Sequence, residues 1–327
     1  MSSYLPRRRD TLLGLGAAAV SAAFPSHLLA QAAKSLRIVV PFAAGGTADM
    51  LPRLLSEKMR VHYPGGVVID NRTGAGGNIG AEFVYRADPD GSTLLASPPG
   101  PIAINHNLYR RLNFDPARWV PVTVIATVPN VLAVSNKLPV RSVAEFLAYV
   151  KKNPGTVNVA TQGNGSTSHL TAALFMQLTG TQMNLVPYKG TAPALIDLIG
   201  GTVDVFFDNI SSSLQHHRGG KVRILAVADD QRSKALPEIP TFADQNLPGM
   251  QAVTFFSVVA PPGTPTTVAA TAQSQIALAL DAPDVRVKFA EQGAEPRGWS
   301  AAQTTKFIQT ETDRWAKVIR SANVTLE

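Results

Sequence analysis

Short apolar runs alternate with helical patterns along most of the chain. The first run, 38–40, is β-branched at every position and precedes leucines at helical spacing in 50–60. Pro41 cannot donate to a sheet ladder, so this strand should end there. Thr47 or Asp49 is then placed to cap the helix that follows. Repeated strand–turn–helix units predict an α/β protein whose sheets are parallel and whose connections are crossover helices.

The same pattern recurs after residue 140, which predicts a second α/β lobe. Two long β-rich runs, at 121–135 and 255–261, are interpreted as strands that cross between the lobes. Amphipathic helices at 268–280 and 301–322 would return the chain to the first lobe. We therefore expect one lobe built from 33–130 plus 254–327 and another built from 131–253.

The N-terminus has the parts of a secretory signal. Three arginines at 7–9 precede a short apolar run, and Ala30-Gln31-Ala32 supplies small residues for cleavage. The run is too short and too rich in Ala and Gly to span a bilayer well. The arginine pair favours twin-arginine export, although Thr11 stands where that signal usually has Phe. We expect residues 1–32 to be removed near Ala32 and the mature protein to enter the periplasm.

Composition narrows the function. Hydrophobic residues make up 45% of the chain, which is ample for a core, and the absence of Cys excludes disulfides and thiolate chemistry. The formal charge of +7 is scattered and has no interleaved aromatic residues, so nucleic acid is not expected. The six histidines lack metal-ligand spacing, so we expect neither metal nor cofactor.

Glycine-rich turns follow three of the predicted strands, at 41–49, 71–80 and 162–169. Ligands of open α/β sheets bind at the carboxyl ends of strands, where helix N-termini favour anions. The turns have no P-loop lysine, and the 74–80 turn resembles a dinucleotide turn only in its spacing. Ser166 and His169 could make a hydrolase, but no nucleophile elbow surrounds them, and His169 is more simply a capping or packing residue. A carboxylate is the anion that best suits these turns.

The chain resembles the Bug family, the extracytoplasmic solute receptors of tripartite tricarboxylate transporters. The resemblance covers nearly all of 34–327. It rests on the motifs Val40-Pro41-Phe42-x-x-Gly45-Gly46-x-x-Asp49, Asn71-Arg72-x-Gly74-Ala75-Gly76-Gly77-Asn78-Ile79-Gly80, Gly163-Asn164-Gly165-Ser166-x-Ser168-His169 and Asp204-Val205-x-Phe207-Asp208-Asn209. It implies a two-lobed periplasmic-binding-protein fold of type II (Venus-flytrap) with two crossing strands, and no enzymatic activity.

The resemblance also implies a site for a small carboxylate between the lobes. In the first lobe it would use Phe42, Ala43, Gly46, Thr47 and Asp49, with Ser97 at the adjoining wall. In the second lobe it would use Thr161, Gly163, Ser166, Ser168 and Asp208, with Tyr188 and Lys189 as weaker candidates.

One departure from the family concerns the loop 97–101, Ser-Pro-Pro-Gly-Pro. Prolines stand where the family usually has hydroxyl groups. We therefore expect a stiffer, less polar wall and a ligand with an apolar or aromatic body. The expected partners are this ligand and membrane transporter subunits, or a sensor if the chain is an orphan receptor. We expect a monomer.

Overall fold

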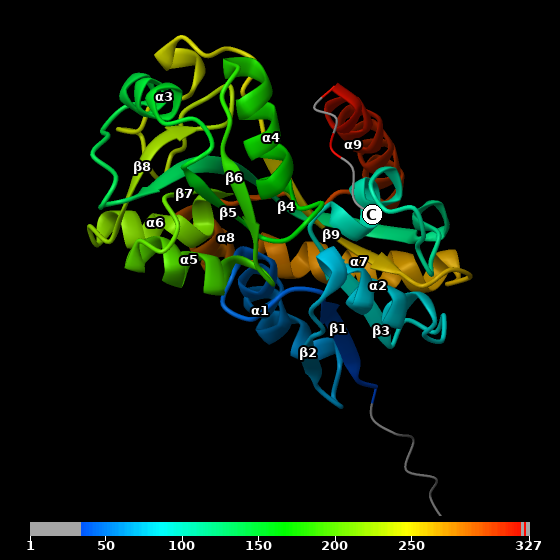
Figure 1. The fold of residues 1–327 in the computed structure, drawn as a ribbon. Coiled ribbons are helices and arrows are strands. Elements are labelled where there is room, and N and C mark those ends of the chain that lie inside the picture. The colour runs from blue at the N-terminus through cyan, green and yellow to red at the C-terminus, as the bar shows by residue number, and fades with distance from the viewer. Residues whose placement is uncertain (1–33, 322–323, 325–327) are drawn as a thin grey trace, which may run out of the picture.

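The first lobe is a mixed sheet whose core is parallel. The computed structural model describes residues 34–321 and residue 324 (Figure 1). Strand β1 pairs in parallel with β2 and β3, and antiparallel β9 joins β3 to β4. A short strand, β10, pairs with β4. The strands are β1 (Leu36–Val40), β2 (Val67–Asn71), β3 (Thr93–Ser97), β4 (Val120–Ser135), β9 (Val253–Ala260) and β10 (Glu295–Pro296).

The second lobe repeats this arrangement. Strand β5 lies parallel between β6 and β7, and β4 is antiparallel to both β7 and β8. The prediction of parallel sheets in both halves is therefore confirmed, with antiparallel pairing confined to β4, β9 and their partners. The strands are β5 (Asn158–Thr161), β6 (Asn184–Pro187), β7 (Val205–Asn209) and β8 (Val222–Val227).

Strand β4 belongs to both lobes. Its residues up to Pro129 pair with β9, whereas those from Asn130 pair with β7 and β8. The backbone N–H of Asn130 donates to the carbonyl of Ala252, so the second crossing, just before β9, lies beside the first. Two adjacent crossings form a natural hinge.

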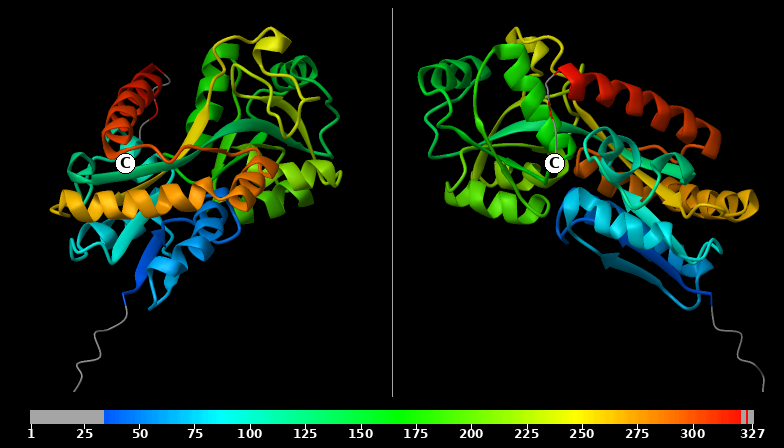
Figure 2. Two further views of the ribbon diagram at one scale, coloured as in Figure 1. Left: turned by 180° about the vertical axis from the view of Figure 1, so that it is seen from behind. Right: turned by 45° about the vertical axis from the view of Figure 1, so that its right-hand side comes forward.

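One apolar core runs under both lobes. Helices α1, α7 and α8 of the first lobe and α5 and α6 of the second pack on the same side of the sheets (Figures 1 and 2). A second core lies on the other side, around α3 and α4. The helices are α1 (Thr47–Met59), α2 (Asn78–Tyr85), α3 (Val143–Lys152), α4 (Thr167–Thr179), α5 (Thr191–Gly200), α6 (Ile210–Arg218), α7 (Thr266–Asp281), α8 (Pro283–Glu291) and α9 (Ala301–Ser321).

Helix α9 straddles the two lobes. Its Phe307 ring meets Phe255 of β9 in an edge-on contact, with ring centroids 5.3 Å apart. Its Trp315 and Ile319 are buried in the same cluster as Phe175 of α4. Only part of this helix therefore returns to the first lobe as expected. Its predicted last residue, Ala322, lies outside the described residues, as do the signal peptide and its cleavage site.

Three local predictions differ from the structure. Helix α1 begins at Thr47 rather than at residue 50, and Gly46 is its N-cap, so the prediction that Thr47 or Asp49 caps it is wrong. The 97–101 loop runs into a π-helical turn, Gly100–Ile104, whose amides share the carbonyl of Pro99. Helix α8 and strand β10 were not expected. Helix α8 buries only Val285 and Phe289, so its sequence has little apolar periodicity that could indicate a helix.

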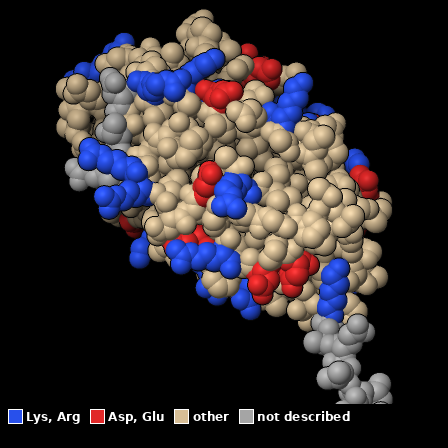
Figure 3. Space-filling model, turned by 90° about the vertical axis from the view of Figure 1, so that its right-hand side faces the viewer, with Lys and Arg blue, Asp and Glu red and all other residues tan. Residues whose placement is uncertain are grey.

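Charged side chains of both signs are dispersed over the face in Figure 3, among wide neutral areas. In the part of the chain that the structure describes, no helix combines the length and apolar character needed to cross a membrane.

Candidate functional site

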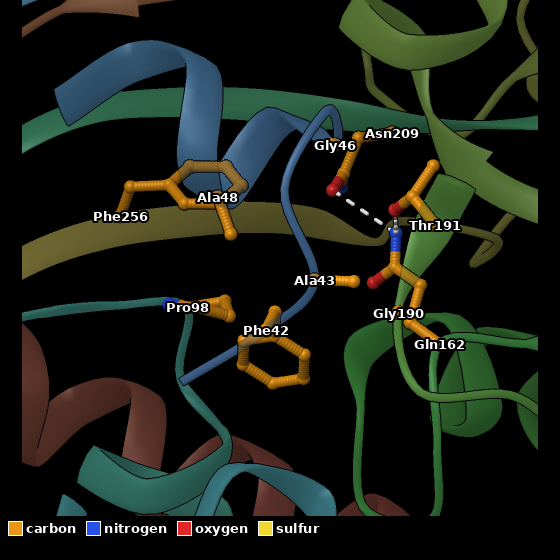
Figure 4. Close-up of a pocket in the computed structure, with 10 residues that line it drawn as sticks. All are labelled: Phe42, Ala43, Gly46, Ala48, Pro98, Gln162, Gly190, Thr191, Asn209 and Phe256. Carbon is orange, nitrogen blue, oxygen red and sulfur yellow. Dashed lines mark hydrogen bonds between the residues drawn. The ribbon is translucent and has the colours of Figure 1, made fainter. Parts of the chain in front are cut away.

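A small cavity of about 10 Å³, space for roughly one water molecule in this closed arrangement, lies between the lobes (Figure 4). It is lined in the first lobe by Phe42, Ala43, Gly46, Ala48, Pro98 and Phe256, and in the second lobe by Gln162, Gly190, Thr191 and Asn209. The first lobe contributes mostly apolar surface and the second lobe mostly polar side chains. The lining contains no Lys or Arg. An anion held here would have to be bound by dipoles and hydrogen bonds.

Three helices begin at this cavity. Gly46, Gly190 and Asn209 are the N-caps of α1, α5 and α6, and all three residues line the cavity. The N-terminus of a helix carries unpaired N–H groups and a partial positive charge. Among the described residues, no acceptor pairs with the backbone N–H of Gly46 or Ala48. The cavity is therefore electropositive without containing a cationic side chain.

Glycine lets the lobes approach closely here. A Cβ atom at Gly46 would lie 3.0 Å from the Cβ of Thr191, which is too close for normal packing. Gly190 has a φ of +119°, which only glycine adopts without strain, and it packs against Ala43. The hydroxyl groups of Thr47 and Ser212 are 2.6 Å apart across the junction. The two lobes are thus closed on each other beside the cavity.

The polar wall of the second lobe is a connected hydrogen-bond network. Gln162 Nε2 lies 2.9 Å from Thr191 Oγ1, 2.9 Å from Asp208 Oδ1 and 3.3 Å from Asn209 Oδ1. All four side chains are buried. Buried polar groups are held in one arrangement when their partners are satisfied, so this wall is preorganised.

The network continues from the cavity to the hinge. Asn209 Nδ2 donates to Asn130 Oδ1 of β4 at 2.7 Å and to Thr254 Oγ1 of β9 at 2.8 Å. The Thr254 hydroxyl also donates to Asn130 Oδ1. Asn130 and Thr254 stand where the two strands cross between the lobes. Asn209, which lines the cavity, is therefore hydrogen-bonded directly to both crossing strands.

Asp208 lies behind this wall and is fully buried. Its carboxyl group accepts hydrogen bonds from Gln162 Nε2 and from Ser213 Oγ, the latter at 2.8 Å. Burial raises the pKa of Asp208 to about 7, because desolvation outweighs the hydrogen bonds that it accepts. Asp208 is adjacent to the cavity lining and reaches it through Gln162.

Asp49 braces the first-lobe turn. Its carboxylate accepts hydrogen bonds from the Gly45 N–H at 3.0 Å, from Arg53 Nε at 2.9 Å and from Asn71 Nδ2 at 3.0 Å. Burial alone would raise the pKa of Asp49, but these hydrogen bonds outweigh it and hold the pKa below its usual value. With its oxygens occupied in this way, Asp49 shapes the turn from outside the cavity lining.

The 163–168 turn, expected as the second-lobe jaw, meets a different part of the first lobe. Gly163 and Asn164 lie against Gly76 of the 74–77 turn, and neither lines the cavity. Ser166 is the N-cap of α4, and Ser168 is fully buried with no hydrogen-bond partner for its hydroxyl group among the described residues. Here too, two glycine-rich turns pack across the junction.

The remaining predicted residues surround the cavity without lining it. Ser97 ends β3 beside Pro98 and donates to the Pro98 carbonyl. Thr161 ends β5 beside Gln162 and is buried. The hydroxyl group of Tyr188 donates to Asp197 at 2.6 Å; burial and this bond raise the Tyr188 pKa to about 12. Lys189 is exposed.

Ser166 and His169 are not arranged as a nucleophile and its base. Ser166 Oγ accepts from the backbone N–H of His169, and His169 Nδ1 accepts from the backbone N–H of Gly165. The expectation that His169 is a capping or packing residue is confirmed. Within residues 34–321, no group of three or more His, Asp or Glu side chains is arranged to hold a metal ion.

Sequence reasoning missed several lining residues. Gln162, Gly190 and Asn209 each follow or end a predicted strand. The rule that ligands bind at the carboxyl ends of strands could therefore have identified them. Ala48 and Phe256 carried no such signal, because their side chains resemble those of ordinary core positions.

Two α/β lobes joined by adjacent crossing strands, with a preorganised cavity between them, define a solute-binding receptor. The chain belongs to the family described as tripartite tricarboxylate transporter family receptor, which matches residues 51–324. It is 35% identical to protein BugT of Bordetella pertussis over 97% of this chain and 98% of that protein.

Solved structures show the same fold. Rpa4515 of R. palustris, solved with adipate, is 40% identical and has a TM-score of 0.86, covering 89% of this chain and 98% of its own. MatC of Rhodopseudomonas palustris, with bound malate, is 32% identical and has a TM-score of 0.83, covering 87% of this chain and 98% of its own.

Proposed function

We propose that this protein is a periplasmic receptor that captures a small carboxylate between its lobes for a tripartite tricarboxylate transporter. The observation that carries this proposal is the convergence of the α1, α5 and α6 N-termini on one cavity. Each helix N-terminus stabilises an adjacent anion by roughly 0.3–1 kcal/mol, and by more when the site is partly buried. A carboxylate can accept hydrogen bonds from several N–H and O–H groups at once, which suits this cavity.

The ligand has an apolar or aromatic body in this proposal. Phe42, Pro98 and Phe256 give the first-lobe wall an apolar surface beside the electropositive end. When the lobes part to admit a ligand, a hydrocarbon chain or ring buried against this wall would be stabilised by removal of its surface from water. The relative with adipate, a dicarboxylate with a hydrocarbon body, supports this ligand class over citrate.

The ligand-binding residues of the proposal fall into two groups. The direct contacts are Phe42, Ala43, Gly46, Gln162, Gly190, Thr191 and Asn209. The supporting residues are Thr47, Asp49, Ser97, Thr161, Gly163, Ser166, Ser168, Tyr188 and Asp208. The latter hold turns, caps and the polar wall in place. The proposal includes no catalysis. Ser166 is the N-cap of α4, and this structural role for its hydroxyl group supports a receptor over a hydrolase.

The proposed receptor is exported to the periplasm and acts there as a monomer. Residues 1–32 act as a twin-arginine-like signal that is removed near Ala32, and the mature protein is a monomer whose lobes divide at 130/131 and 253/254. N-terminal sequencing of the protein recovered from a periplasmic extract tests the cleavage site. Light scattering of the mature protein tests the monomer.

Isothermal titration calorimetry (ITC) with adipate, benzoate, malate and citrate tests the ligand class. We expect adipate or benzoate to bind more tightly than citrate, because citrate would place polar groups against Phe42 and Phe256. Tighter binding of citrate would contradict the apolar-body proposal. If no carboxylate binds, the receptor function itself is wrong.

A further inference from the structure

The side-chain amide of Gln162 has a defined orientation. Its Nε2 atom faces three acceptors, on Thr191, Asp208 and Asn209. An –NH₂ group has two hydrogens, so these contacts exhaust its donors. The carbonyl oxygen of Gln162 is the atom left over, and it points toward Ala43 of the first lobe (Figure 4).

Two of these acceptors cannot reverse their role while Asp208 is ionised. The Asn209 amide is held by its donations to Asn130 and Thr254, which leave its oxygen toward Gln162. An ionised carboxylate at Asp208 accepts only. Thr191 alone can adapt, because a hydroxyl group can rotate to donate or accept. An ionised Asp208 therefore makes Gln162 present a carbonyl oxygen to the cavity, and that oxygen repels a carboxylate.

We infer that Asp208 is a proton-dependent positioning residue that sets which end of the Gln162 amide meets the ligand. A proton taken from solvent by Asp208 Oδ1 gives it an O–H group. This group donates to Gln162 Oε1 after the amide turns over, and the Thr191 hydroxyl rotates to donate to the same oxygen. The contact with Asn209 Oδ1, at 3.3 Å the longest of the three, is lost in this arrangement, and the donors on Asp208 and Thr191 compensate for it. Gln162 then offers its –NH₂ group to the ligand carboxylate. Capture therefore takes up one proton. This inference rests on the proposed carboxylate-binding function.

The surroundings of Asp208 support this role. The groups next to it are Ser213 of α6, Gln162 before α4, the backbone N–H of Asn209, and Val131 of β4, which pairs with Asp208. Thr191 of α5 and Asn130 of β4 are bonded to Gln162 and Asn209 and lie one hydrogen bond further away. Among these described neighbours there is no Lys, Arg, His, Asp or Glu. With no counter-charge, the neutral form of Asp208 is accessible near neutral pH, and its pKa of about 7 agrees.

The direction of the pH effect follows from linkage. An anion beside Asp208 raises the pKa of its carboxyl group further, so the complex holds a proton that the free protein has released above pH 7. Affinity for a fully ionised ligand should therefore fall as pH rises above about 7, by up to about tenfold per pH unit for one proton. Burial lowers the pKa of His169 of α4, so its imidazole is neutral throughout that range.

The experiment is ITC of adipate from pH 7 to 9, in pairs of buffers with different ionisation enthalpies. Wild-type protein should take up a proton on binding, and its affinity should fall with pH. Asp208→Asn should bind adipate with a flat pH profile. Asp204→Asn, a matched change just before the other end of β7 where the carboxylate accepts the Asn158 N–H, should keep the wild-type slope.

Ser213→Ala provides an independent variant. It removes a hydrogen bond to Asp208 Oδ2, which should raise the Asp208 pKa and move the fall in affinity to higher pH. Binding without proton uptake in the wild type would overturn the inference, as would an unchanged slope in Asp208→Asn or an unmoved midpoint in Ser213→Ala. If adipate, benzoate and malate all fail to bind at pH 7, the proposed function is contradicted instead.

Discussion

The two walls of the cavity are built from different chemistry. In the first lobe, the side chains that line it are apolar, such as Phe42 and Phe256, and the polar contribution comes from the backbone at Gly46. In the second lobe, Gln162, Thr191 and Asn209 supply amide and hydroxyl groups that hydrogen-bond one another. The first wall provides shape and a helix N-terminus, whereas the second provides amide and hydroxyl groups that hold one another in place.

The walls also differ in their connection to the rest of the molecule. The first-lobe turn is braced locally, by Asp49, Arg53 and Asn71. The second-lobe wall is bonded through Asn209 to Asn130 and Thr254 on the crossing strands. Changes in the first wall should therefore act on fit and local stability. Changes in the second should act on binding and on the hinge together.

The largest effect should come from blocking the contact between the walls. In Gly46→Val, the added side chain would collide with Thr191, and the φ of −93° at this position suits valine, so the effect is steric. We expect a loss of adipate affinity of about 100-fold, which corresponds to overpacking of about 3 kcal/mol. Calorimetry measures this loss. Gly200→Val on α5 is the control, because a Cβ there meets only Thr202, at 3.9 Å, and affinity should be unchanged.

The next largest effect should come from cutting the second wall from the hinge. Asn209→Leu removes the hydrogen bonds to Asn130 and Thr254 and places an apolar side chain in a buried polar network. We expect the free energy of unfolding, measured in urea, to fall by about 2 kcal/mol, and the affinity for adipate to fall as well. Thr254→Val and the double variant complete a mutant cycle. Strict additivity of the two single changes would show that the residues are uncoupled, contrary to this view.

The smallest effect should come from loosening the first wall's brace. Asp49→Asn weakens the contacts with Arg53, which is about half exposed, so we expect about 1 kcal/mol of destabilisation at pH 7. The pKa of Asp49 is lowered in the folded state, so its contribution is present above its unfolded pKa and is lost as pH falls.

Urea unfolding at pH 7 and near pH 3 measures this difference. The stability difference between wild type and Asp49→Asn should be smaller at the lower pH, and adipate affinity at pH 7 should change by less than about threefold, since Asp49 does not line the cavity. A stability difference as large at low pH as at pH 7, or a large loss of affinity, would be inconsistent with a bracing role.

Much of the architecture could be predicted from local patterns. The β-branched run before Pro41 forms β1, which ends at Val40 as predicted. The strand–turn–helix order correctly predicted parallel pairing in both lobes. The cap of α1 was harder to place. Asp49 has the chemistry of an N-cap, but its carboxylate reaches back to the Gly45 N–H from inside the first turn, and Gly46 takes the cap position.

The sequence by itself determined the periodicities, the glycine-rich turns at strand ends and the motifs of the receptor family, because each depends on residues close together in the chain. Only the tertiary structure decided which turns face each other. It paired Gly46 with Thr191, set Gly163 against Gly76 and buried Asp208 behind Gln162. These relations depend on how the two lobes close on each other across the shared crossing strands. That closure is set by long-range packing, which no short stretch of sequence encodes.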